Sequence, residues 1–261
     1  MLTTILAAAA PKGENPYGLM QALKEGGLIS QTVFAILVLM LFVSLYIFFT
    51  KIFEQQKIIN QAKRVRASFW SSNSLREGAA KLEKNSAYRQ IVDDGVQAQE
   101  QYKELTDPVE AHDWLHGSLA RSEGVINSAL NGGLAFLATV GATAPFIGLF
   151  GTVIGIYRAL IKIGASGQAS IDAVAGPVGE ALIMTALGLV VAVPAVLGYN
   201  FLQRRNKSIA EGLNTFSNDV LGYLASDGRV RPAKKVVAGA PVKPVASTTT
   251  AGQTGGVPTR S

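Results

Sequence analysis

The sequence predicts an all-α membrane protein with three transmembrane helices and long cytoplasmic helical extensions. Three charge-free stretches, at 26–50, 124–157 and 181–203, lead to this fold class. A helix needs about 20 apolar residues to cross a bilayer, and each stretch is long enough. Charged residues make up only 16% of the 261-residue chain, whereas soluble domains carry about 25%.

The first span is expected over 28–49, after an N-terminal tail at 1–27. The apolar run from Met1 to Ala10 is short and lacks a basic region before it. We interpret it as a free tail, and its removal as a signal peptide stays open. The helix of the first span is predicted to continue past Phe53 and Ile59.

The segment 50–130 is expected to be a cytoplasmic helical region rather than a separate domain. Its eleven basic residues are matched by eleven acidic ones, which is typical of a solvated surface. Ser74 and Glu77 have the spacing of a capping box at a helix start. Asp107-Pro108 with Glu110 is typical of another helix start. That second helix is predicted to run without a break into the second span.

The second span is expected over 131–162 and the third over 171–202, joined by a short periplasmic turn at 163–170. A cytoplasmic helical extension at 203–228 then leads into a tail at 229–261. The tail is rich in Pro, Gly, Thr and Ser, so it is expected to be disordered.

Lysine and arginine counts predict the orientation of the spans. Residues 1–30 hold two basic residues, 51–123 hold eleven and 204–261 hold nine. Cytoplasmic segments carry the excess of Lys and Arg. The N-terminus is therefore expected outside the cytoplasm and the C-terminus inside it.

Small residues recur at helical spacing on the second and third spans. The second span carries Gly141, Pro145, Gly148, Gly151, Thr152 and Gly155, and the third carries Ala181, Thr185, Gly188, Ala192 and Ala195. Helices in lipid associate through close packing of such faces. Pro145, Pro177 and Pro194 each free a carbonyl, which is tolerated where protein or water satisfies it.

Glu180 is the only charged residue between Ala173 and Gln203. A carboxylate at a helix centre in the membrane costs roughly 2.5–3.5 kcal/mol, so such residues are functional by default. At about 1.5 Å per residue, Thr152 lies at a similar depth on the neighbouring helix, and Thr185 lies closer to the cytoplasm.

These three residues, Glu180, Thr152 and Thr185, are the candidate proton pathway. Five residues separate Glu180 from Thr185, roughly 140° around a helix, so a shared path needs a wide lumen or a rotating helix. The alternative is a buried acid that only holds an interface, paired with Arg158 or Lys162. Threonines that bond their own helix are equally compatible with packing alone.

Other motifs do not predict an enzyme, a cofactor or a metal site. The chain has no cysteine. His112 and His116 have the spacing of zinc ligands but lack an obvious third ligand. The glycine-rich run Gly148–Gly155 lacks the lysine of a phosphate-binding loop and follows no strand.

Two segments resemble a known family. Ala138–Ile156 reads ATVGATAPFIGLFGTVIGI, and Gly179–Asn200 reads GEALIMTALGLVVAVPAVLGYN. Together they resemble the MotA/TolQ/ExbB proton-channel family, and the first segment looks most like its ExbB branch. The resemblance covers roughly 100–205.

The resemblance implies a subunit of a proton-driven motor in the bacterial inner membrane, with the N-terminus in the periplasm. Such subunits form a homo-oligomeric ring, usually a pentamer. Such a ring encloses single spans of an ExbD-like partner and works through a TonB-like protein to power outer-membrane uptake. The third-span acid of the family falls on Glu180, and its pathway threonines fall on Thr152 and Thr185. A TolQ-like role in envelope integrity and a passive membrane scaffold are the alternatives.

Overall fold

The computed structural model describes residues 27–106, 110–166 and 171–232, and this part of the chain is helical without a strand. Its elements are α3 (Gly27–Ser68), the 3-10 helix η1 (Phe69–Ser71), α4 (Leu75–Ala80), α5 (Ala87–Tyr102), α6 (Ala111–Asn131), α7 (Leu134–Ser166) and α8 (Ile171–Ala225). Some expectations concern segments outside the described residues. These segments are the N-terminal tail, Asp107-Pro108, the end of the turn and most of the C-terminal tail.

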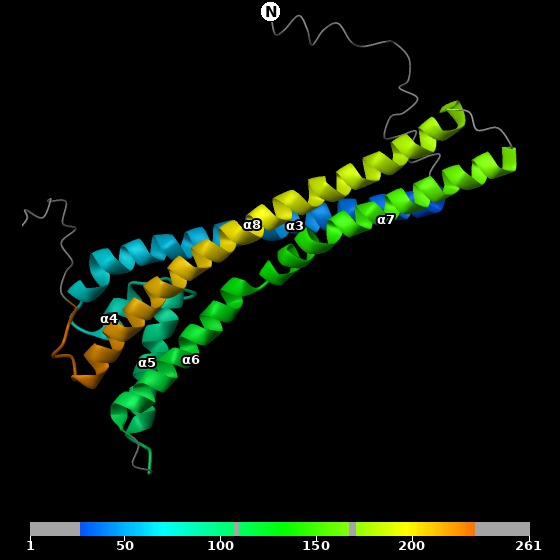
Figure 1. Cartoon of the computed structure of the whole chain (residues 1–261). Coiled ribbons are helices and arrows are strands. Elements are labelled where there is room, and N and C mark those ends of the chain that lie inside the picture. The colour runs from blue at the N-terminus through cyan, green and yellow to red at the C-terminus, as the bar shows by residue number, and fades with distance from the viewer. Residues whose placement is uncertain (1–26, 107–109, 167–170, 233–261) are drawn as a thin grey trace, which may run out of the picture. The chain divides into compact units, whose positions relative to one another are not determined.

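Three stretches of the described residues are long and apolar enough to cross a membrane. They are Gly27–Ser71, Ala111–Ala165 and Gly176–Ala225. α7 and α8 form the most extensive helix pair, and α3 packs against both (Figure 1). α3 runs to Ser68, which confirms that the first helix continues past Phe53 and Ile59.

A second set of contacts is centred on α5, which packs against α6 and α8 (Figure 1). Ile91 and Val92 of α5 are fully buried there, together with Leu119 of α6 and Val220 of α8. We call this cluster the α5 core. Its apolar side chains recur at helical spacing on otherwise polar helices, so burying that face is what holds these helices together.

The predicted capping box at the start of α4 is confirmed. The backbone N–H of Glu77 donates to the Ser74 Oγ at 3.2 Å. The Glu77 carboxylate in turn accepts from the backbone N–H of Asn73 at 3.1 Å. One N–H group that the helix itself leaves unpaired is thus satisfied, and the return bond reaches Asn73, the residue before the N-cap, rather than Ser74.

The prediction of an unbroken helix into the second span is wrong. α6 ends at Asn131 and α7 begins at Leu134. Between them Gly133 has φ +81°, and a Cβ atom there would lie 3.0 Å from the Ile47 Cγ2. Glycine adopts this left-handed conformation without a steric penalty, so the helix axis can change direction here.

Side-chain amides join the helices at this break, and those of Gln55 and Asn206 are buried. Gln55 Nε2 donates to the Leu202 carbonyl at 3.0 Å and to Asn206 Oδ1 at 2.7 Å. Asn206 Nδ2 donates to the Leu130 carbonyl and to Asn131 Oδ1, both at 3.0 Å. We call Gln55, Asn131 and Asn206 the junction amides. They fasten α3, the end of α6 and α8 to one another.

Candidate functional site

The α7–α8 pair carries the candidate residues, and its two backbones come closest at Gly148 and Gly188. A Cβ atom on Gly188 would lie 2.8 Å from the Ala144 carbonyl oxygen and 3.2 Å from the Gly148 Cα. A Cβ atom on Gly148 would lie 2.6 Å from the Met184 carbonyl oxygen. Neither position has space for a side chain, because the atoms in the way belong to the backbone.

Small residues extend this contact in both directions along the helices. A Cβ atom on Gly155 would lie 3.3 Å from the Ala181 Cβ, and Gly141 lies against the Val196 side chain. Ala192 and Ala195 are buried in the same membrane cluster as Met184. Lipid tails are as apolar as Leu, so burying apolar side chains does not drive helices together in a membrane. Close packing of small residues such as these does so instead.

The three prolines all lie inside helices. α7 continues through Pro145, and α8 continues through Pro177 and Pro194. Pro145 is itself part of the close approach, because its Cα would lie 3.3 Å from a Cβ atom on Gly188. Pro145 is therefore accommodated at the α7–α8 contact and does not end α7.

Thr152 lies on α7 and is only 6% exposed. Its hydroxyl donates to the Leu149 carbonyl of the same helix at 2.5 Å. The hydroxyl oxygen still has lone pairs to accept a further hydrogen bond. The Thr152 hydroxyl can therefore accept a hydrogen bond while it donates its own proton to the Leu149 carbonyl.

Glu180 and Thr185 both lie on α8, within the stretch that contacts α7. Ala181, the residue after Glu180, faces Gly155. Met184, the residue before Thr185, packs on Gly151, where an added Cβ atom would lie 3.0 Å from the Met184 Cβ. Thr185 is half-buried. The backbone at Glu180 is described, but its side chain lies outside the described part of the structure.

The segments that carry the three candidates therefore run alongside one another. Residues 151–155 of α7 lie beside 181–184 of α8, and Thr152 is on the first of these segments. Because α8 is helical from Glu180 to Thr185, their positions remain about 140° apart around it. The structure thus brings Thr152 near the α8 segment without placing all three residues on one line.

Arg158 is a predicted alternative partner for Glu180, and its guanidinium lies beside α3. Nη1 would lie 3.3 Å from a Cβ atom on Gly27, the first residue of that helix. The side chain of Lys162, the other basic candidate, lies outside the described residues.

The other motifs take ordinary helical positions. The His112 and His116 rings stack at 6.2 Å between centroids on α6. Among the described residues no group of three His, Cys, Asp or Glu side chains could hold a metal ion. Gly148–Gly155 lies inside α7, where its N–H groups belong to the helix rather than to a loop.

The sequence did not predict that α3 and the junction amides pack and hydrogen-bond beside the α7–α8 pair. Val33 of α3 would lie 3.3 Å from a Cβ atom on Gly151, so the first helix closes one side of the site. Gln55 is fully buried, although its neighbours in the sequence are polar and exposed. A buried amide on a solvated-looking segment leaves no signal in composition or spacing.

The matches to known proteins include the α7–α8 region just described. The model of the MotA/TolQ/ExbB proton channel family matches residues 83–215. A biopolymer transport protein ExbB of Xanthomonas campestris pv. campestris (strain B100) is 38% identical over 256 residues, which cover 88% of this chain and 100% of the relative. An ExbB of Neisseria gonorrhoeae is 52% identical over 117 residues, 45% of this chain and 53% of the relative. A Tol-Pal system protein TolQ of Haemophilus influenzae is 32% identical over 179 residues, 64% of this chain and 75% of the relative.

Proposed function

Since this chain belongs to the MotA/TolQ/ExbB proton channel family, we propose that it is an ExbB-like subunit of a proton-driven motor in the inner membrane. With ExbD-like and TonB-like partners, the motor powers outer-membrane uptake of siderophores and other nutrients. One observation carries the ExbB-like assignment: the ExbB relative of Xanthomonas is similar along its whole length, at 38% identity.

In this proposal Glu180 carries the proton, and Thr152 and Thr185 lie along its path. Charge on a carboxyl group is expensive within the membrane, and protonation removes that charge. One elementary charge crossing the membrane is worth about 2.3 kcal/mol per 100 mV. That energy is enough to bias a two-state element whose preferred arrangement depends on the protonation of Glu180.

The motor is proposed to be a ring of identical chains around the partner spans. The outward faces of α7 and α8 support this assembly. They expose large apolar side chains, among them Val153 and Tyr157 on α7 and Leu182, Leu189 and Val193 on α8. Such faces need lipid or further helices beside them, and a ring supplies helices.

The experiment replaces Glu180 with Gln in cells that produce the chain with its native partners, and assembly is checked by purifying the complex. Gln has nearly the same shape but cannot release a proton, so proton-gradient-dependent siderophore uptake should be lost while the complex still assembles. Glu211→Gln is the matched control, because Glu211 lies on the same helix and is exposed. Normal uptake by an assembled Glu180→Gln complex would sink the proposal and favour a passive scaffold.

A TolQ-like role in envelope integrity is the second candidate, favoured by the TolQ relative that is similar over 64% of the chain. Co-purification separates the two roles. An ExbB-like subunit should bring down ExbD-like and TonB-like proteins, whereas a TolQ-like subunit should bring down a TolR-like protein.

A further inference from the structure

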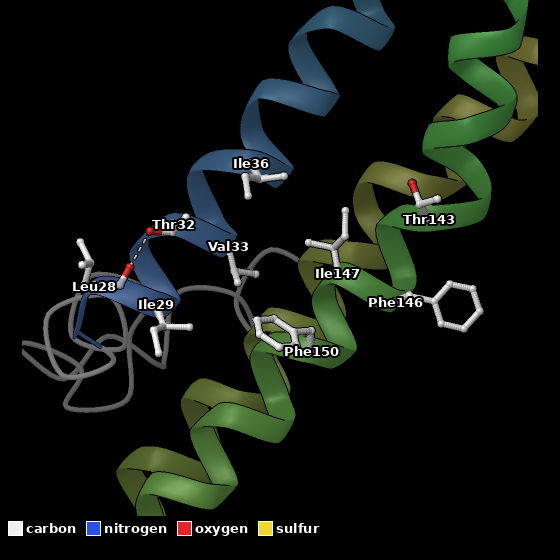
Figure 2. A pocket seen from close by; sticks show the side chains of 9 residues that line it. All are labelled: Leu28, Ile29, Thr32, Val33, Ile36, Thr143, Phe146, Ile147 and Phe150. Carbon is white, nitrogen blue, oxygen red and sulfur yellow. Dashed lines mark hydrogen bonds between the residues drawn. The ribbon is translucent and has the colours of Figure 1, made fainter.

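A groove of about 530 Å³ lies between α3 and α7, at the end of α3 that begins with Gly27 (Figure 2). The residues that form most of its wall are Leu28, Val33 and Ile36 on α3 and Phe146, Ile147 and Phe150 on α7. Figure 2 shows Val33 and Ile147 turned toward the space between the two helices. The groove lies within apolar stretches that are long enough to cross a membrane, so bilayer hydrocarbon can reach its open side.

The two hydroxyl groups in the wall are already satisfied. Thr32 Oγ1 donates to the Leu28 carbonyl, and Thr143 Oγ1 donates to the Thr139 carbonyl, each at 2.8 Å. Both bonds stay within one helix, so neither hydroxyl has a proton left to donate to an occupant. The remaining wall of the groove is apolar, so its contacts with an occupant are mainly hydrocarbon contacts.

The bulk of the wall distinguishes this groove from a helix-packing surface. Where this protein packs two membrane helices closely, the contact is made by glycines, as at Gly148 and Gly188. The groove instead has branched and aromatic side chains, with Phe150 still 53% exposed. Such side chains keep a helical backbone at a distance, whereas a flexible hydrocarbon chain can lie between them.

A cation stands at the end of the groove. The Arg158 guanidinium lies beside Gly27, the residue before Leu28 in the groove wall. Among the described side chains, no carboxylate is within ion-pair distance of Arg158. A guanidinium pairs with phosphate oxygens in a bidentate fork, which suits a phospholipid headgroup.

We propose that this groove is a binding site for an anionic phospholipid, with one acyl chain between α3 and α7 and the phosphate against Arg158. The volume falls within the roughly 300–1,000 Å³ typical of small-molecule sites. The site is separate from the α7–α8 contact that carries the candidate proton pathway, so it does not depend on the proposed motor function.

Lipid retention tests the headgroup contact. The full complex is reconstituted in bilayers of equal parts phosphatidylglycerol and phosphatidylcholine, extracted in mild detergent and analysed for bound lipid by mass spectrometry. Wild type should retain phosphatidylglycerol several-fold over phosphatidylcholine, and Arg158→Gln should lose that preference. Arg121→Gln, which removes an exposed charge on α6, should keep it. Equal preference in Arg158→Gln and wild type would overturn the proposal.

Photo-cross-linking identifies the occupant directly. A benzophenone amino acid replaces Phe150 in the groove, or Phe42, which is 65% exposed on α3 and is not part of the groove wall. In the same bilayers, position 150 should cross-link phosphatidylglycerol in excess of its share of the bilayer, and position 42 should follow the bilayer composition. A cross-link from position 150 to a second copy of the chain, or bulk composition at both positions, would show the proposal to be wrong.

Discussion

Gln55 is a polar residue whose loss should destabilise the whole protein. It is fully buried, and its amide donates to both the Leu202 carbonyl and Asn206. Gln55→Leu leaves both acceptors without this donor, and buried unsatisfied groups cost about 1–3 kcal/mol each. Its own Oε1 has no partner among the described residues, so removing it offsets part of that loss. We expect a net loss of about 1–2 kcal/mol of unfolding free energy, measured by denaturant unfolding in detergent.

The neighbouring Gln56 provides the control. Its amide donates to Asn60 and accepts from Arg205 at an exposed surface. Gln56→Leu should change the free energy of unfolding by no more than about 0.5 kcal/mol. Equal effects of the two substitutions would mean that the junction amides do not stabilise the fold.

Glu83 links the turn before α5 to α3 and should make stability depend on pH. Gln61, Lys57 and Arg64 surround its carboxylate at 3.1–3.4 Å. The hydrogen bond from Gln61 and then the one from Lys57 lower the pKa of Glu83 below its ordinary value of 4.5. A lowered folded-state pKa means that the stabilisation is fully present above pH 4.5 and is lost as the pH falls through the folded-state pKa.

Glu83→Gln should therefore lower the thermal unfolding midpoint at pH 7 and have less effect toward pH 3.5. Glu104→Gln, at an exposed position beyond α5, serves as the control. A constant difference between Glu83→Gln and wild type across this pH range would contradict the assignment.

The candidate residues themselves show what sequence can and cannot supply. Glu180 stands out because charge is expensive in an apolar segment, and Thr152 follows from its expected depth. That Thr152 donates to its own Leu149 carbonyl is a rotamer choice, which no sequence pattern specifies.

At the scale of elements, Gly133 should be the residue most sensitive to substitution at the α6–α7 break. Its φ of +81° is a left-handed conformation, which costs an L-residue roughly 1–2 kcal/mol. An added Cβ atom would also press on Ile47 at 3.0 Å. Gly133→Ala should therefore lower the thermal unfolding midpoint of the protein in detergent.

Gly124→Ala on α6 is the matched control. A Cβ atom there would meet nothing within 4 Å, and Ala is the better helix former by about 1 kcal/mol. Gly124→Ala should leave the protein as stable or slightly more stable. If Gly133→Ala behaved the same way, the break would not depend on the left-handed glycine.

The break itself escapes sequence analysis for a physical reason. Glycine is frequent inside membrane helices, where it serves close packing. Gly132 and Gly133 therefore look no different from Gly148, which lies within α7. The left-handed φ of +81° at Gly133 and its contact with Ile47 of α3 distinguish the turn from the packing position, and both depend on the folded structure.

At the scale of the whole molecule, the membrane part is predictable and the rest much less so. Three apolar stretches follow from hydropathy, because the bilayer acts on each segment separately. The α5 core instead needs residues far apart in the sequence, such as Ile91 and Val220, to meet. No local pattern states which amphipathic faces will pair.

In the proposed motor, the α7–α8 pair should move as one body. Rotating α8 by one residue, about 100°, would bring Leu187 or Leu189 to the place of Gly188, where backbone atoms leave no space. The movement that the proposal assigns to protonation of Glu180 should therefore occur between this pair and its partners. The chain has no cysteine, so a disulfide can test this without background.

Gly155→Cys with Ala181→Cys places the two sulfurs within reach. The Cβ atoms would be 3.3 Å apart, slightly closer than the roughly 3.5–4.5 Å of disulfides. Oxidation should link α7 to α8 within each chain, seen as an intramolecular bond by mass spectrometry, and proton-gradient-dependent uptake should persist. The reduced double variant and the oxidised single variants control for the substitutions beside Glu180. Uptake that stops on oxidation and returns with reductant would show that the two helices slide against each other.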